Sequence, residues 1–201
     1  INQLGYDEFI KIINEFSPHY VGISAYTENI VSAFEIADIL KRINNGLKII
    51  LGGSHVSALP VETLQENGNI DFVIAGEGEK SFLMLLECLD NNQEVAGLSG
   101  VYRRKNEKKA GEQENLLIHD LDSLLFPDWG LVGLKNYRPL IKFSANALEL
   151  PLITQRGCPY SCTFCFDLHG KQVRQRTINN VLEEIDLNFN KYQAKNFAIL
   201  D

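Results

Sequence analysis

The chain has 201 residues, of which 45% are apolar and 22% charged, and its formal net charge is −7. This composition is typical of a globular chain that can bury a core, and the length allows one or two domains. The acidic balance argues against general nucleic-acid binding and membrane-surface binding, because both favour a basic face. No apolar run reaches transmembrane length, and the 4 cysteines do not form a disulfide framework. We therefore expect a cytoplasmic protein with no membrane partner.

The first 90 residues alternate between helical and strand patterns. Three strand-like runs are apolar throughout, YVGIS at 20–24, KIIL at 48–51 and DFVIA at 71–75. Apolar residues at helical spacing precede, separate and follow these runs, with a short helix near 61–65. Apolar strands that alternate with helices form a parallel sheet covered on both faces. We predict a doubly wound, Rossmann-like α/β domain over residues 1–110.

From Gly97 the pattern changes. GVYRR and the lysine-rich turn after it, with Lys105, Lys108 and Lys109, predict a short hairpin at the sheet edge. A solvated turn is the simplest interpretation of these basic residues. Residues 111–148 carry turn residues and isolated apolar ones, so we predict a linker between domains.

A second α/β unit is predicted over residues 149–201. It begins with the strand LPLIT, which leads into a cysteine-rich loop, and continues with a helix capped by Thr177 and the strand NFAIL. The chain begins at Ile1 rather than methionine and stops at Asp201, directly after that strand. We therefore expect an internal piece of a longer protein.

Three cysteines fall within eight residues of the run RGCPYSCTFC, namely Cys158, Cys162 and Cys165, whereas Cys88 is remote. Thiolate sulfur is a soft ligand that suits iron–sulfur clusters, zinc or copper(I). A four-iron cluster usually takes four cysteines. Three cysteines leave one iron open to another ligand, and catalysis requires such an open position.

Two other interpretations of the cysteines stay open. His169 could complete a Cys3His structural zinc site, or the cysteines could be reduced thiols without a metal. Structural zinc sites usually pair two knuckles across a longer loop, whereas these ligands fall on one tight loop. The strand-like ELPLIT before the loop also favours the iron–sulfur interpretation.

Small, hydroxyl and acidic residues follow each predicted strand of the first domain. They are Ser24 and Thr27 after the first strand, Gly52, Gly53 and His55 after the second, and Gly76, Glu77, Gly78 and Glu79 after the third. Ligands of open parallel sheets bind beyond the carboxyl ends of the strands, so these loops form one candidate site. The absence of G-x-G-x-x-G argues against a nicotinamide site.

Several of these residues have plainer interpretations. His55 could cap a helix or fill the core, and Glu77 and Glu79 could only complement a helix dipole. The paired glycines 52 and 53 would leave room for a bulky ligand.

The C-x3-C-x2-C spacing, with Phe164 before the last cysteine, resembles the radical S-adenosylmethionine family. The runs VGISAYT, LGGSHV, GEGE and LDSLLFPD, in this order, resemble the subfamily with an N-terminal cobalamin (B12)-binding domain. The resemblance covers nearly the whole chain. It implies that 149–201 starts a TIM-type barrel and that two strands of the cobalamin-binding domain precede Ile1.

The resemblance also implies a set of cofactors. The three cysteines would hold a [4Fe-4S] cluster, whose open iron binds S-adenosylmethionine, with Phe164 near the adenine and Asp201 near the amino group. Cobalamin would bind at the three strand-end loops. Flavodoxin or ferredoxin would act as the reductant.

The implied activity is reductive cleavage of S-adenosylmethionine and cobalamin-dependent methyl transfer to an unreactive carbon of a small-molecule substrate. We expect the 201-residue piece to be inactive by itself. Cobalamin-free radical cyclisation or rearrangement is the alternative within the family, and a non-catalytic zinc or iron–sulfur binding module is the alternative outside it. A methylthiotransferase would need further cluster cysteines, which Cys88 alone cannot supply.

Overall fold

The structure is a computed structural model that describes residues 5–104, 117–134 and 148–201. The chain divides into two compact units. Among the described residues, the first unit contains 5–104, 117 and Thr163–His169, and the second contains 118–134, 148–162 and 170–201. The predicted domain boundaries at 110 and 149 stay a prediction. The lysine-rich turn with Lys105, Lys108 and Lys109 and the middle of the predicted linker lie outside the described residues.

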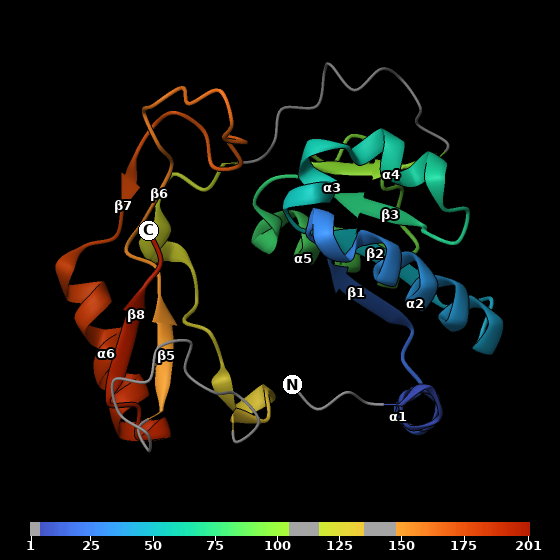
Figure 1. Cartoon of the computed structure of the whole chain (residues 1–201), viewed down its shortest axis with the longest axis horizontal. Helices are drawn as coiled ribbons and strands as arrows, with labels where there is room; N and C mark the ends of the chain where they lie inside the picture. The colour runs from blue at the N-terminus through green and yellow to red at the C-terminus, as the bar shows by residue number, and fades with distance from the viewer. Residues whose placement is uncertain (1–4, 105–116, 135–147) are drawn as a thin grey trace. The chain divides into compact units, whose positions relative to one another are not determined.

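The first unit contains one sheet with the strand order β1-β2-β3-β4 (Figure 1). The strands are β1 (Tyr20–Ser24), β2 (Lys48–Gly52), β3 (Phe72–Ile74) and β4 (Val101–Arg103). The first three strands are parallel, as predicted, and β4 runs antiparallel beside β3 at the sheet edge. The predicted edge hairpin is thus represented by β4, and the residues that would complete it lie outside the described ranges.

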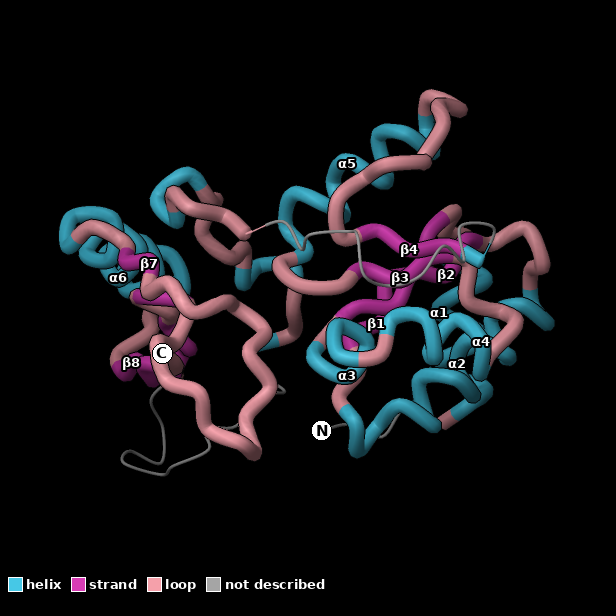
Figure 2. Tube along the Cα trace, turned by 90° about the horizontal axis from the view of Figure 1, so that it is seen from above, coloured by secondary structure: helices cyan, strands magenta, loops and turns pink. Residues whose placement is uncertain are grey.

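Helices cover both faces of this sheet, as Figure 2 shows. They are α1 (Tyr6–Phe16), α2 (Ile30–Ile43), α3 (Ser54–Ala58), α4 (Pro60–Glu66) and α5 (Gly78–Asp90). Successive residues of a strand point to opposite faces. Ile49, Leu51 and Val73 therefore pack with α2, α3 and α4, whereas Ile50 and Ile74 pack with α5. This two-sided core confirms the α/β fold class.

The second unit contains a β-α-β motif. Its strands β5 (Glu149–Leu152) and β8 (Asn196–Ile199) are parallel neighbours, and α6 (Ile178–Tyr192) connects them in the chain (Figure 1). A short antiparallel pair, β6 (Gln155–Arg156) and β7 (Arg174–Gln175), flanks the cysteine loop. Thr177 caps α6 as predicted, since its side chain accepts a hydrogen bond from Asn180 N. Parallel strands joined by a helix are the repeating unit of a TIM-type barrel.

The described part of the predicted linker is docked on the second unit through its own hydrogen bonds. Asp122 accepts a hydrogen bond from Thr177 N at 3.0 Å, beside the start of α6. Asp128 accepts hydrogen bonds from Tyr192 Oη at 2.5 Å and from Lys191 Nζ at 3.2 Å, at the end of α6. The two aspartates therefore hold this segment along the helix. Among the described residues, no helix is long and apolar enough to span a membrane.

Candidate functional site

The parallel strands of the first unit end together, because β1 and β2 are in register from Tyr20 opposite Lys48 to Ser24 opposite Gly52. The loops after β1, β2 and β3 therefore meet at one edge of the sheet, as predicted. We refer to residues 24–27, 52–55 and 76–79 as the first, second and third edge loops. Hydrogen bonds link these loops to one another, and several involve residues absent from the predicted site.

The first and second edge loops are joined through their backbones at Ala25. Ala25 N donates to Gly52 O at 2.8 Å, and His55 N donates to Ala25 O at 3.3 Å. Gly53 has a φ of +102°, and a Cβ at this position would lie 2.5 Å from Ala25 O. Gly53 is thus required by the loop's conformation and by this close approach. The interpretation that glycine at 53 leaves room for a ligand is wrong, since the protein's own backbone occupies that space.

The second and third edge loops are joined by the Ser57 side chain, which is 7% exposed. Its Oγ donates to Gly53 O at 2.8 Å and accepts a hydrogen bond from Gly76 N at 2.9 Å. On the other side of the third loop, Ala75 N donates to Gly100 O at 2.9 Å. Neither Ser57 nor Gly100 was predicted as a site residue. Nothing in the local sequence marks Ser57 except its helical spacing of four from Gly53.

The polar side chains of the first two loops lie toward solvent. His55 is half-buried, and its Nδ1 lies 3.1 Å from Oγ1 of the exposed Thr27. His55 thus bridges two edge loops, which differs from both plainer interpretations of this residue. Ser24, at the end of β1, is also exposed. These groups offer hydroxyl and imidazole hydrogen-bonding atoms at the sheet edge.

The two glutamates of the third loop differ. The side chain of Glu77 is fully buried, and its Oε1 lies 3.0 Å from Nδ1 of His169. Glu79 is exposed in the first turn of α5, where a carboxylate complements the helix dipole. Gly78 lies at ordinary contact distance from Ile74, so its lack of a side chain is not required by close packing. Glu77 therefore acts within the protein, and only Glu79 is on the surface of this loop.

The cysteine loop is closed at its neck. Cys158 N donates to Gly170 O at 3.0 Å, and Gly157 has a φ of +94° and lies against Gln172 O, so that a Cβ at 157 would clash with that oxygen. Cys158 at the neck, and Cys162 and Cys165 within the loop, are all exposed free thiols. Phe164 is 90% exposed, so it is not a packing aromatic in this structure.

Three free cysteine thiols on one short loop are a donor set that fits an iron–sulfur cluster with one open iron. Within the part of the chain that the structure describes, no three His, Cys, Asp or Glu side chains gather in a metal-binding arrangement. His169, which the zinc alternative needs, directs Nδ1 to Glu77.

Asp201 is placed at the carboxyl end of β5 within the second unit. Its carboxylate accepts hydrogen bonds from Thr154 N at 2.6 Å, from Gln155 N at 3.1 Å and from Thr154 Oγ1. Desolvation by itself would raise the pKa of Asp201, but the hydrogen bonds from Thr154 and Gln155 together outweigh it and lower the pKa. Asp201 is thus an ionised group that holds the start of the segment leading to the cysteine loop.

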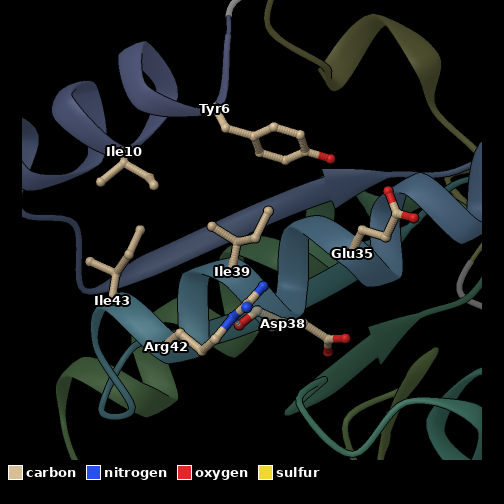
Figure 3. Close-up of a pocket in the computed structure, with 7 residues that line it drawn as sticks. All are labelled: Tyr6, Ile10, Glu35, Asp38, Ile39, Arg42 and Ile43. Carbon is tan, nitrogen blue, oxygen red and sulfur yellow. Dashed lines mark hydrogen bonds between the residues drawn. The ribbon is translucent and has the colours of Figure 1, made fainter.

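A groove of about 600 Å³ lies between α1 and α2 (Figure 3). Tyr6, Ile10, Ile39 and Ile43 contribute apolar side chains to it. Asp38, also in its lining, accepts hydrogen bonds from Asn67 and Asn69, so its carboxylate is already engaged. None of the predicted site residues lines this groove, and we interpret it as the packing seam of the two helices.

Comparisons with known proteins connect these features. Residues 1–86 match the B12 binding domain family. An uncharacterised methyltransferase of Pyrococcus horikoshii is 33% identical over 98% of this chain and 42% of its own length. The anaerobic magnesium-protoporphyrin IX monomethyl ester cyclase of Rubrivivax gelatinosus is 28% identical over the whole chain and 36% of its own length. The chain therefore spans about two fifths of these relatives.

The fold is shared with a solved radical S-adenosylmethionine methyltransferase, TsrM of Kitasatospora setae, whose structure contains cobalamin and a [4Fe-4S] cluster. The TM-score is 0.67 at 18% identity, over 97% of this chain and 40% of TsrM. Residues 1–86 thus match the B12 binding domain family, and the whole chain resembles radical S-adenosylmethionine proteins that carry such a domain at their N-terminus. The family resemblance is thus confirmed, and the comparisons support the predicted cofactor set as a whole.

Proposed function

We propose that the protein is a cobalamin-dependent radical S-adenosylmethionine methyltransferase that acts on an unreactive carbon of a small-molecule substrate. The observation that carries this proposal is the combination, in one chain, of a three-thiol loop with a hydrogen-bonded sheet edge in a segment that matches the B12 binding domain. Each part fits one of the two cofactors. Methyl transfer is the activity named for the Pyrococcus relative and for TsrM.

Cys158, Cys162 and Cys165 would hold the cluster, and their loop leaves the fourth position to S-adenosylmethionine. When bound, the cluster supplies the electron that cleaves the sulfonium bond, and cobalamin carries the methyl group. The exposed Phe164 provides an apolar surface on which the adenine could stack. Asp201 keeps a charged carboxylate at the end of β5, and the amino group of S-adenosylmethionine is a cation that such a carboxylate attracts. A flavodoxin or ferredoxin remains the expected electron donor.

In the first unit, the edge loops would bind the nucleotide tail of cobalamin. Ser24, Thr27 and His55 offer polar atoms at the exposed edge, and Gly52 lets the backbone come close to a ligand. Gly76 and Gly78 form the turn on the other side, where α5 begins. A Cβ at Gly52 would meet only an ordinary contact at 3.8 Å, so the fold tolerates a larger side chain there. Such a side chain would instead narrow the slot for the nucleotide tail.

Radical cyclisation is the second candidate function. It is favoured by the similarity to the magnesium-protoporphyrin cyclase, which extends over the whole of this chain. The cysteine loop and the edge loops serve both reactions equally well. The two functions differ in what becomes of the methyl group of S-adenosylmethionine.

The test is a product analysis of the full-length protein, reconstituted without oxygen with iron, sulfide and hydroxocobalamin. Under a low-potential reductant, S-adenosylmethionine should give both 5′-deoxyadenosine and S-adenosylhomocysteine, because methyl donation leaves S-adenosylhomocysteine behind. The matched control is the same protein reconstituted without cobalamin, which should give 5′-deoxyadenosine alone. Formation of 5′-deoxyadenosine without S-adenosylhomocysteine in the presence of bound cobalamin would favour cyclisation. Stoichiometric zinc without iron would favour the binding module.

A further inference from the structure

The Ser57 hydroxyl connects the second edge loop with the third, because it both donates and accepts a hydrogen bond. Its hydroxyl donates to Gly53 O and accepts from Gly76 N. The backbone N of Ser57 also donates to Gly53 O, at 2.9 Å. Gly53 O therefore accepts two hydrogen bonds from Ser57, so losing the hydroxyl would leave one of them in place. The Gly76 amide, in contrast, donates to the hydroxyl itself. The distinctive contribution of Ser57 is its contact with Gly76.

Gly76 occupies a position where the chain must turn. Its φ is +82°, and it connects the buried end of β3 to the start of α5. The strand ends are fixed by the sheet, but a glycine turn has few side-chain contacts that would hold its amide in one orientation. An acceptor 2.9 Å from Gly76 N sets that orientation relative to the second loop. The buried Ser57 hydroxyl thus fixes the position of the third loop relative to the second.

We infer that Ser57 is a positioning residue of the cobalamin site, an inference that rests on the proposed function. Its hydroxyl holds the Gly76 turn against the Gly53 turn, so that the slot between the edge loops is formed before the ligand arrives. Preorganisation of this kind raises affinity because the loops lose little freedom on binding. Ser57 needs no contact with cobalamin to have this effect.

The experiment compares Ser57→Ala with Thr63→Val in the protein. Thr63 is the matched control because its buried hydroxyl and its backbone N both donate to the carbonyl four residues earlier, Leu59 O, as Ser57 does with Gly53 O. Thr63 has no contact with an edge loop among its hydrogen bonds. Two quantities are measured: hydroxocobalamin affinity, from the visible spectrum during titration, and deuterium exchange of the peptide that contains Gly76.

We expect Ser57→Ala to weaken hydroxocobalamin binding about tenfold, the size of effect produced by losing one buried hydrogen bond. The Gly76 peptide should exchange faster in Ser57→Ala, and Thr63→Val should change neither quantity. Unchanged exchange at Gly76, or equal affinity in Ser57→Ala and the unmodified protein, would overturn the inference. If the unmodified protein retains no hydroxocobalamin, the proposed function fails, and the exchange result still decides whether Ser57 positions the turn.

Discussion

The edge of the four-stranded sheet and the cysteine loop present their ligand-binding groups in opposite ways. At the sheet edge, Ala25 and Ser57 connect the loops through hydrogen bonds of 2.8 to 3.3 Å, and Gly53 lies in contact with the backbone of Ala25. In the cysteine loop, Cys158 N donates to Gly170 O at the neck, and the thiols of Cys158, Cys162 and Cys165 are all exposed. At the sheet edge, the loops are held by hydrogen bonds within the protein, whereas the cysteine loop presents its metal-binding groups to solvent.

This difference follows from how the two kinds of ligand are held. A binding slot for an organic cofactor is largely formed before the cofactor binds. The buried backbone groups that line it must therefore already be hydrogen-bonded. A cluster loop needs three thiolates that can reach the irons, and metal–thiolate bonds supply the free energy that orders the loop. We therefore expect substitutions at the sheet edge to act through the stability and order of the edge loops, and substitutions in the cysteine loop to act through cluster content.

The largest effect should come from Cys162→Ala. With two remaining thiolates on the loop, the cluster loses a ligand, and the iron content of the anaerobically reconstituted protein should fall from about four per chain to near zero. Iron and sulfide analysis, together with the visible absorption of the cluster, gives the measurement. Because Cys162 is exposed and its thiol packs against no core, the thermal unfolding midpoint of the cluster-free protein should barely change.

Cys88→Ala is the control for this variant. Cys88 is partly buried on α5 and packs against the core cluster of Ile50, Ile74 and Leu85. We expect it to cost some stability and to leave the iron content intact, the reverse of the Cys162 result. Full retention of four irons in Cys162→Ala would show that the loop does not hold the cluster.

A smaller effect, of the opposite kind, is expected from Gly53→Ala. The added Cβ would lie 2.5 Å from Ala25 O on a backbone with a φ of +102°, so both strain and overlap destabilise the fold. Each of these contributions typically costs 1–3 kcal/mol, and we expect a loss of about 3 kcal/mol in the free energy of unfolding. Chemical denaturation measures this change directly.

Gly52→Ala provides the comparison at the adjacent position. The nearest atom to its Cβ is Ile74 O at 3.8 Å, an ordinary contact, so the expected loss is within about 1 kcal/mol. Similar losses in both variants would contradict the assignment of Gly53 as the conformationally required glycine. Gly53 is consequently a poor position at which to test cofactor binding, since its variants would unfold first.

The fold of the first unit was largely predictable because its strands are apolar throughout. YVGIS, KIIL and DFVIA became β1, β2 and β3, and the meeting of their carboxyl ends follows from parallel pairing alone. The predicted helix near 61–65 is α4. The short helix α3, which contains Ser57, was not predicted, because five residues after a double glycine give no helical periodicity to detect.

The contacts that join distant segments were not predictable from local patterns. Glu77 was predicted as a cofactor contact or a helix-dipole partner, yet its side chain is fully buried and contacts the half-buried His169, 92 positions further along the chain. Asp122 and Asp128 looked like turn residues of a linker, whereas both accept hydrogen bonds from the ends of α6. In each case a carboxylate in a turn-rich sequence is compatible with solvent and with a partner. Only the tertiary structure distinguishes the two.

The smallest predicted effect concerns Asp128, whose carboxylate holds the described linker segment on α6. Substituting it tests how far this contact stabilises the second unit. Hydrogen bonds from Tyr192, Gly130 N and Lys191 lower the pKa of Asp128 from 3.8 to about 2. A carboxyl group with a lowered pKa stabilises the folded state above its unfolded pKa, and this contribution is lost as the pH falls through the folded pKa. Asp128→Asn should therefore lower the thermal midpoint slightly at neutral pH, and the difference from the unmodified protein should shrink between pH 3.8 and about 2.

Asp186→Asn, which changes an exposed carboxylate on α6, is the control. A midpoint difference that stays constant over this range would mean that the docked segment is held by its apolar contacts, and that the ordered part of the second unit does not depend on Asp128.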